Sequence, residues 1–200
     1  DDAFSPFSPV GRLHALGIEQ LLPRLHRDPA LAGRFHYQSS NTALLGLVVE
    51  RVHNKPLTQV LSEQIWQPAG AQDAYWRRNP ATGRASAYCC LYARPLDWIR
   101  VGRFLLNNGT PTARFLPEGL WSQFLNPDID PEARRAGVYG LHIRHDVLDR
   151  SGATLAGPFA YLMGHAGQVV YLLPDRDWVV VRFGAEPQLL HSTLYDLAQP

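Results

Sequence analysis

The spacing of apolar residues changes from a helical to an extended period near Arg135. Before that position, apolar residues recur every three or four positions, which is the spacing that buries one face of a helix. The helices expected from this spacing are Val10–Leu25, Thr42–His53, Leu57–Ile65, Pro95–Asn107 and Pro117–Leu125. After it, short runs rich in β-branched and aromatic residues are separated by Gly, Pro and Asp, as is typical of strands. The segments expected there are the strands Val138–Arg144, Phe159–Met163, Gln168–Leu173 and Trp178–Phe183 and a closing helix, Leu189–Ala198.

The segment Thr42–His53 carries a pronounced helical pattern, and Asn54 and Pro56 predict where it ends. Its apolar positions predict a wide buried face, formed by Leu44, Leu45, Val48, Val49 and Val52. Polar residues directly precede this face. Ser39, Ser40 and Asn41 are residue types that cap a helix by accepting hydrogen bonds from its first N–H groups. They can also line a pocket, and the two roles are compatible.

The order of the elements predicts the fold class. Helices followed by strands and one last helix indicate an α/β fold of the α+β type, with an antiparallel sheet flanked by helices and a separate helical region. The last three strands are close enough in sequence to form an antiparallel meander, with Pro174–Asp177 as a tight turn. We expect residues 1–135 to be mainly helical and residues 136–200 to supply the strands and the closing helix. A cleft is expected between the two regions.

The composition narrows the class of function. The 200 residues are 46% hydrophobic and 18% charged with a formal net charge of +1, which is typical of a globular domain without nucleic acid as a partner. The longest apolar runs are a few residues, whereas a membrane-spanning helix needs about 20. No Gly-x-Ser-x-Gly elbow, phosphate loop or dinucleotide fingerprint occurs, and no cofactor is expected.

Cysteine and histidine give no clear signal for a redox or metal site. Cys89 and Cys90 are adjacent, a strained spacing for a mutual disulfide, and are interpreted as buried packing residues. His142 and His145, next to Asp146, have ligand chemistry, but a regular strand would place the two histidines on opposite faces. No metal site is predicted.

Four sequence blocks occur in an order that resembles a known family. They are YQSSNTALLGLVVERV, PLTQVLSEQIWQPAGAQDAYW, AYCCLYARPLDWIRVGRFLLNNG and YLMGHAGQVVYLLPDRDWVVVRFG. These blocks resemble the serine hydrolases related to class C β-lactamases, DD-peptidases and nylon-oligomer hydrolases. The resemblance runs from about Phe35 to Gly184.

The resemblance implies a chemistry for particular residues. In that family a serine of a Ser-x-x-Lys motif attacks an ester or amide carbonyl, and the lysine and a tyrosine manage its proton. Tyr37 and Ser39 occupy the tyrosine motif in its Tyr-x-Ser form. The triplet His165, Ala166 and Gly167 takes the place of the family's Lys-Thr-Gly, a departure that weakens recognition of a ligand carboxylate.

The resemblance also implies the lining of the substrate pocket. The N–H of Gln168 is implied as a donor to the oxyanion, beside Gly167, whose missing side chain lets a substrate carbonyl approach the backbone. Asn41 follows the tyrosine motif and is expected to line the same pocket. Trp76 resembles an aromatic residue of the cleft rim, although a core tryptophan explains it almost as well.

The nucleophile motif itself is missing. The chain contains one lysine, Lys55, and the residue three positions before it is Val52 rather than serine. We therefore expect these residues to be the C-terminal part of one catalytic domain, incomplete on its N-terminal side. The expected partners are a small ester or amide substrate and the segment that carries Ser-x-x-Lys, in the same polypeptide or a second chain. Alone, the chain is expected to be inactive.

Two other functions remain open. The chain can be a non-catalytic ligand-binding or sensing domain derived from the penicillin-recognising fold, which differs from an enzyme in lacking Ser-x-x-Lys altogether. It can also be a helix-rich interaction domain without pocket chemistry, if the family match is accidental. The resemblance favours a periplasmic or extracellular location.

Overall fold

The computed structural model describes residues 5, 8–26, 28–32, 36–128, 138–147, 158–184 and 191–198. Contacts divide the chain into two compact units. We call Asp1–Glu63 with Ala74–Tyr92 the helical unit, and Gln64–Asp73 with Ala93–Pro200 the sheet unit. Each is described by itself. Among the described residues, no helix is both long and apolar enough to cross a bilayer.

The helical unit begins with a helix that is interrupted early. Helix α1 (Pro9–Leu16) starts with Pro9 in its first turn, and the Ser8 hydroxyl accepts a hydrogen bond from the N–H of Gly11. Gly17 has a φ of +76°, which ends α1 before the short helix α2 (Ile18–Leu21) and the 3₁₀ turn Leu22–Arg24. The helical spacing over Val10–Leu25, which Gly17 and Pro23 interrupt in the sequence, is therefore confirmed, with both interruptions at those residues.

Helix α3 (Ser39–His53) is the longest element of the helical unit that the structure describes. It ends at Asn54, which adopts the left-handed conformation and closes the last turn. The wide buried face predicted for this helix is only partly right, because Leu44 packs against the core cluster and three other predicted members are exposed. Its buried residues are Ala43 and Gly46, whereas Leu45, Val48 and Val52 are 48%, 54% and 76% exposed.

The side of α3 that carries the small residues Ala43 and Gly46 is the side that packs against the rest of the helical unit. A Cβ on Gly46 would lie 2.7 Å from the Cβ of Ala87, so the loop through Ala87 approaches the helix where a side chain is absent. On the same side, Ala43 packs with Leu13 and Ile18 in the core cluster of this unit. Helix α4 (Leu57–Leu61) follows and continues as a π-helical turn, Ser62–Trp66. A two-stranded ribbon, β1 (Tyr75–Trp76) with β2 (Leu91–Tyr92), completes the helical unit.

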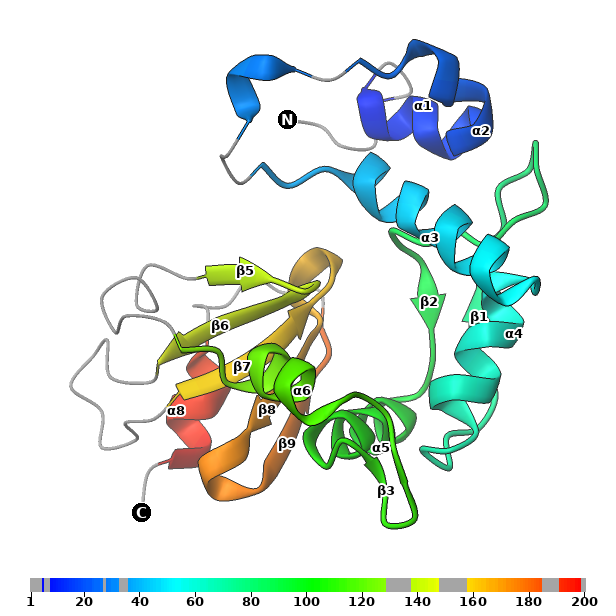
Figure 1. Cartoon of the computed structure of the whole chain (residues 1–200). Coiled ribbons are helices and arrows are strands. Elements are labelled where there is room, and N and C mark those ends of the chain that lie inside the picture. The colour runs from blue at the N-terminus through cyan, green and yellow to red at the C-terminus, as the bar shows by residue number, and fades with distance from the viewer. Residues whose placement is uncertain are drawn as a thin grey trace. The chain divides into compact units, whose positions relative to one another are not determined.

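The sheet unit contains a five-stranded antiparallel sheet in which neighbours in sequence are neighbours in space (Figure 1). Its strands are β5 (Val138–Gly140), β6 (Ile143–Val147), β7 (Pro158–Met163), β8 (Val169–Leu173) and β9 (Trp178–Arg182). The meander predicted for the last three strands is confirmed, and Pro174–Arg176 with Asp177 in the left-handed conformation forms its tight turn. The mixed fold with an antiparallel sheet is also as predicted.

One predicted strand is wrong in its extent. The segment Val138–Arg144 is a hairpin, because Leu141 and His142 have φ values of +52° and +62° and turn the chain between β5 and β6. Non-glycine residues adopt this conformation mainly in turns. Gly140, directly before the turn, is the local signal for it in the sequence.

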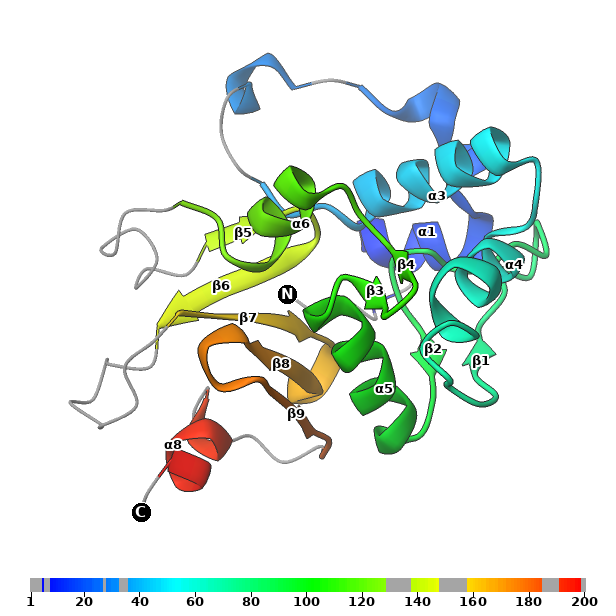
Figure 2. The ribbon, with the colours of Figure 1, turned by 60° about the horizontal axis from the view of Figure 1, so that its bottom comes forward.

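Helices cover both faces of β8. On one face, Gly102 of helix α5 (Pro95–Leu106) lies against Val170 and Leu172 and against Val179 of β9. Figure 2 shows α5 beside β8 and β9. On the other face, Leu194 of helix α8 (Ser192–Ala198) packs with the odd-numbered residues Val169, Tyr171 and Leu173. Both faces are therefore buried, which is why β8 reads as a continuous apolar run. Residues 185–190 lie outside the description, and with them the predicted start of the closing helix.

A buried carboxylate fixes the start of α5. The Asp97 side chain is fully buried, accepts a hydrogen bond from the Gln72 N–H at 2.9 Å, and pairs with Arg94 and Arg100, each at 2.9 Å. The hydrogen bond from Arg94, followed by that from Gln72, holds the pKa of Asp97 below its ordinary value. Beyond α5, the ribbon of β3 (Gly109–Thr110) with β4 (Ala113–Arg114) leads to helix α6 (Glu118–Leu125).

Candidate active site

The start of α3 presents the tyrosine motif. Gln38 is the N-cap residue in extended conformation, and its carbonyl accepts a hydrogen bond from the Asn41 N–H at 3.1 Å. No side chain caps the helix, so the capping role considered for Ser39, Ser40 and Asn41 is wrong. The reason is position: the N-cap is Gln38, and these residues already lie inside the first helical turn.

The residues at this helix end differ in exposure. Tyr37 is 54% exposed, Ser39 is half-buried and Asn41 is exposed. Within the described part of the chain, the side chains of Ser39 and Asn41 make no hydrogen bond. The structure thus places Tyr37, Ser39 and Asn41 together in sequence and space at one helix end.

Trp76 has its polar edge turned toward the protein. This residue of β1 is half-buried, and its indole N–H donates to the carbonyls of Ser86 and Cys89, at 3.0 and 2.9 Å. The ring therefore holds the loop after Arg84 in place. Its indole nitrogen is engaged inside the helical unit rather than directed at a substrate.

The interpretation of the two cysteines as buried packing residues is wrong. Cys89 and Cys90 form a disulfide with each other, and both are half-buried. Cys90 has a φ of +68°, and its carbonyl accepts a hydrogen bond from the Arg77 N–H. The bond joins neighbours in sequence and therefore fixes this turn locally.

In the sheet unit, the second motif forms the tight connection between β7 and β8. His165, Ala166 and Gly167 make a short 3₁₀ turn in which Ala166 and Gly167 have φ values of +58° and +76°. The N–H of Gly164 donates to the Gln168 carbonyl at 2.7 Å and closes the turn. His165 and Ala166 are exposed, and Gly167 and Gln168 are half-buried.

Two side chains hold this turn in place. The Gln168 side-chain amide donates to the Gly184 carbonyl at 2.8 Å and accepts from the Gly184 N–H at 3.1 Å. The Arg182 guanidinium donates to the Gly167 carbonyl, and its Nη1 would lie 2.7 Å from a Cβ on residue 167. The space beside the Gly167 Cα is therefore filled by Arg182.

Sequence reasoning missed Arg182. Arg182 is a cation beside the His165–Gly167 turn, in which histidine occupies the position of the family's lysine. A cation there can attract the carboxylate of a ligand or stabilise negative charge developing nearby. The only signal in the sequence is an arginine that closes the apolar strand WVVVR, and its direction depends on pairing with β8.

The predicted residues thus form separate groups. Tyr37, Ser39, Asn41 and Trp76 belong to the helical unit, and the turn His165–Gly167 with Gln168 belongs to the sheet unit. The structure defines the geometry inside each group.

The histidines considered as metal ligands have other partners. His142 lies in the β5–β6 turn, where its Nδ1 is 3.1 Å from the Tyr139 hydroxyl. His145 is buried in β6, with Nε2 2.8 Å from the Phe124 carbonyl of α6. The regular strand assumed for the two histidines does not exist, because the turn at Leu141 and His142 interrupts it.

The comparison with protein families identifies the chain. The family model described as Beta-lactamase matches residues 6–192, which include both the Tyr37 motif and the turn at His165. The chain belongs to the beta-lactamase family. No curated protein sequence matches the chain.

Solved structures show the same fold. A putative 6-aminohexanoate-dimer hydrolase from Bacillus anthracis matches 90% of this chain with a TM-score of 0.72 and 21% identity. Simvastatin synthase (LovD) from Aspergillus terreus matches 80% of it with a TM-score of 0.57 and 17% identity. The matches cover 46% and 52% of those two chains, so this member of the beta-lactamase family spans about half of their length.

Proposed function

We propose that this chain is the C-terminal part of a serine hydrolase that cleaves an ester or amide through an acyl-serine intermediate. The observation that carries the proposal is the family match over residues 6–192, which spans the tyrosine motif and the turn at His165. The nucleophilic serine and its lysine are supplied by a Ser-x-x-Lys segment outside these residues. That segment is part of the same polypeptide or a second chain.

In this proposal, residues of the chain itself transfer the proton of the serine and stabilise the negative charge that develops on the carbonyl oxygen. Tyr37 receives or relays the proton of the attacking serine. The Gln168 N–H donates to the oxyanion, a contribution of about 3 kcal/mol in comparable sites. His165 and Arg182 provide polar and positive groups beside the reacting carbonyl.

The lysine that is present does not suit the catalytic role. Lys55 follows the left-handed cap of α3 and pairs with Glu63, with 2.6 Å between Nζ and Oε2. Its ammonium group is engaged by that carboxylate, and Val52 rather than a serine lies three positions before it. This supports a nucleophile supplied from elsewhere. The Cys89–Cys90 disulfide supports an oxidising location, which we propose to be periplasmic or extracellular.

The mechanism is tested by Tyr37→Phe in the complete hydrolase. Turnover of an ester or amide substrate should fall by about 10² or more, because a positioned proton-transfer group contributes about 10² to 10⁴. The 6-aminohexanoate dimer is the amide to test first, since a similar solved structure carries that name. Tyr75→Phe is the matched control, because Tyr75 is 77% exposed on β1. Equal turnover in Tyr37→Phe and the control would remove Tyr37 from the mechanism.

The absence of a nucleophile is tested on residues 1–200 alone. We expect no covalent labelling by a fluorescent phosphonate or a fluorescent penicillin, because no described serine has an activating base at the motif spacing. Labelling is read by intact mass and peptide mapping. Stoichiometric labelling at Ser39, Ser40 or Ser62 would place the nucleophile in this chain and overturn the fragment proposal.

A further inference from the structure

A groove lies at the C-terminal end of α3, within the helical unit. It has a volume of about 880 Å³ and is lined by α2 and the turn after it, the end of α3, the start of α4 and the loop Arg78–Ala85. Helix α3 has 15 residues, so a rise of about 1.5 Å per residue separates its two ends by roughly 20 Å. The tyrosine motif precedes the other end. The groove is therefore a separate feature from the proposed active site.

The lining of the groove includes large aliphatic residues, which together we call its apolar wall: Leu22, Leu47, Val48 and Leu57. Leu22 and Val48 are 41% and 54% exposed, which is high for large aliphatic side chains. An apolar molecule lying here would remove this surface from water, at roughly 25 cal/mol for each Å² buried.

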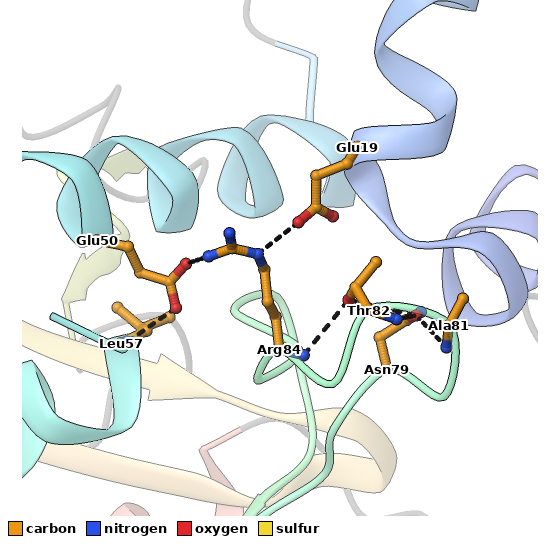
Figure 3. A network of polar contacts seen from close by, with 7 residues as sticks. All are labelled: Glu19, Glu50, Leu57, Asn79, Ala81, Thr82 and Arg84. Atoms are coloured by element: carbon orange, nitrogen blue, oxygen red, sulfur yellow. Dashed lines mark hydrogen bonds and ion pairs between the residues drawn. The ribbon is translucent and has the colours of Figure 1, made fainter. Parts of the chain in front are cut away.

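The charged residues of the groove do not balance one another. Four are basic and two are acidic: Arg51, Lys55, Arg78, Arg84, Glu19 and Glu50. Arg84 pairs with both Glu19 and Glu50, as Figure 3 shows, and this network accounts for both carboxylates. Lys55 is paired with Glu63. Glu50 also accepts a hydrogen bond from the Leu57 N–H at 2.9 Å, so its carboxylate is held between α3, α4 and the loop.

Two arginines remain. Arg51 and Arg78 are exposed on the groove, and no carboxylate in the described part of the chain pairs with either of them. They come from α3 and from the loop Arg78–Ala85, which the Arg84 network ties to α3. Two guanidinium groups beside an apolar wall suit a ligand with one anionic head and one apolar body.

We propose that this groove binds a small amphiphilic organic anion, with its carboxylate at Arg51 and Arg78 and its aliphatic chain along Leu22 and Val48. Arg84, Glu19 and Glu50 keep the walls in place and do not contact the ligand's charge. The site is independent of the serine chemistry, because it uses no residue of the tyrosine motif or of the His165 turn.

Octanoate is the probe, and its binding to the complete protein is followed by NMR chemical shifts of assigned amides in these residues. We expect saturable shifts at groove residues with a Kd on the order of 1 mM. Acetate carries the charge without the chain, and octanol the chain without the charge. Each should bind at least about tenfold more weakly, and salt near 0.5 M should weaken octanoate but not octanol. Equal effects of octanoate and octanol would contradict the role of the arginines.

Variants separate the two halves of the site. Arg51→Gln with Arg78→Gln should weaken octanoate binding roughly three- to tenfold, since each exposed charge contact contributes modestly. Arg12→Gln is the matched control, an exposed arginine of the same unit outside the groove. Val48→Ser should weaken binding through the apolar wall, whereas Leu45→Ser, on the same helix but outside the groove, should not.

Two results would overturn the proposal. Octanoate shifts that are unchanged in the double arginine variant would place the ligand elsewhere. Shifts of groove amides that depend on protein concentration and not on octanoate, with a dimer detected by light scattering, would identify the groove as an interface between two copies of the chain.

Discussion

Each of the two units is stabilised internally by a different kind of interaction. In the sheet unit, all five residues of β8 are buried, and α5 and α8 cover its two faces. In the helical unit the core cluster has three buried members, Leu13, Ile18 and Ala43, and much of the remaining order comes from polar contacts. In an apolar core, truncating any buried side chain lowers the free energy of unfolding. In a polar network, the loss is limited to the few partners that the substituted residue contacts.

The loop Arg78–Ala85 illustrates the second strategy. The Asn79 side-chain oxygen accepts hydrogen bonds from the N–H groups of Ala81 and Thr82, while its nitrogen donates to the His14 carbonyl at 2.9 Å. Arg84 then joins the loop to α2 and α3 through Glu19 and Glu50 (Figure 3). Removing such partners should matter less to the free energy of unfolding than opening a cavity in β8. Four predictions test this difference, in order of decreasing effect.

The largest effect is expected for Leu172→Ala in β8. Leu172 is fully buried, and truncating a buried leucine typically costs about 2–5 kcal/mol through lost burial and the cavity left behind. The free energy of unfolding from urea titration measures the loss, and amide hydrogen exchange should place it in β7–β9. Leu45→Ala, at a 48% exposed position of α3, should change stability by less than about 0.5 kcal/mol. Equal losses would abolish the distinction between the units.

Glycines at helix contacts give the next effect. A Cβ on Gly102 would lie 2.5 Å from Val179 Cγ1, so Gly102→Ala should cost about 1–3 kcal/mol through overpacking. Gly46→Ala meets Ala87 in a loop, which can move more readily than a paired strand, so its cost should be smaller.

Gly119→Ala in α6 is the control for these variants. Nothing lies within 4 Å of its added Cβ, so helix propensity alone should raise the melting temperature slightly. A larger loss for Gly46→Ala than for Gly102→Ala would show that the helical unit is the more rigid of the two.

An intermediate effect is expected for the buried carboxylate of the sheet unit. Because the pKa of Asp97 is lowered in the folded state, its contribution is complete above the unfolded pKa of about 3.9 and is lost as pH falls through the folded pKa. Asp97→Asn should therefore have a lower free energy of unfolding at neutral pH, and its free energy of unfolding should fall less than that of the wild type as the pH is lowered. Urea midpoints measured between about pH 6 and pH 2 test it. An unchanged acid profile would mean that other carboxyl groups cause the acid sensitivity.

The smallest effect is expected for Arg84→Gln in the helical unit. Exposed ion pairs contribute about 0.2–1 kcal/mol, and salt screens them. The wild-type chain in about 1 M NaCl should approach the stability of the variant, because the Debye length there is about 3 Å. Arg114→Gln, which removes the exposed pair with Glu118, is the comparison in the sheet unit. A loss above that of Leu172→Ala would make the polar network the dominant source of stability.

Local elements were predictable because their signals are local. Pro95 marks the start of α5, Asn54 the end of α3, and the Pro174–Asp177 turn joins β8 to β9, as the residue types indicate. The order of helices and strands then predicted an α/β fold with an antiparallel meander. The family resemblance supplied the candidate site residues, whose catalytic roles stay predictions.

The sequence by itself determined the element types, most of their ends and the family, because period, turn residues and short motifs are properties of neighbouring residues. Only the tertiary structure decided which apolar faces are buried, as α3 shows by packing its small side, Ala43 and Gly46, and exposing Leu45, Val48 and Val52. It also placed Arg182 at the Gly167 carbonyl. Such contacts join segments that are far apart in the chain, and the packing partner, rather than the local pattern, determines which side of an element meets it.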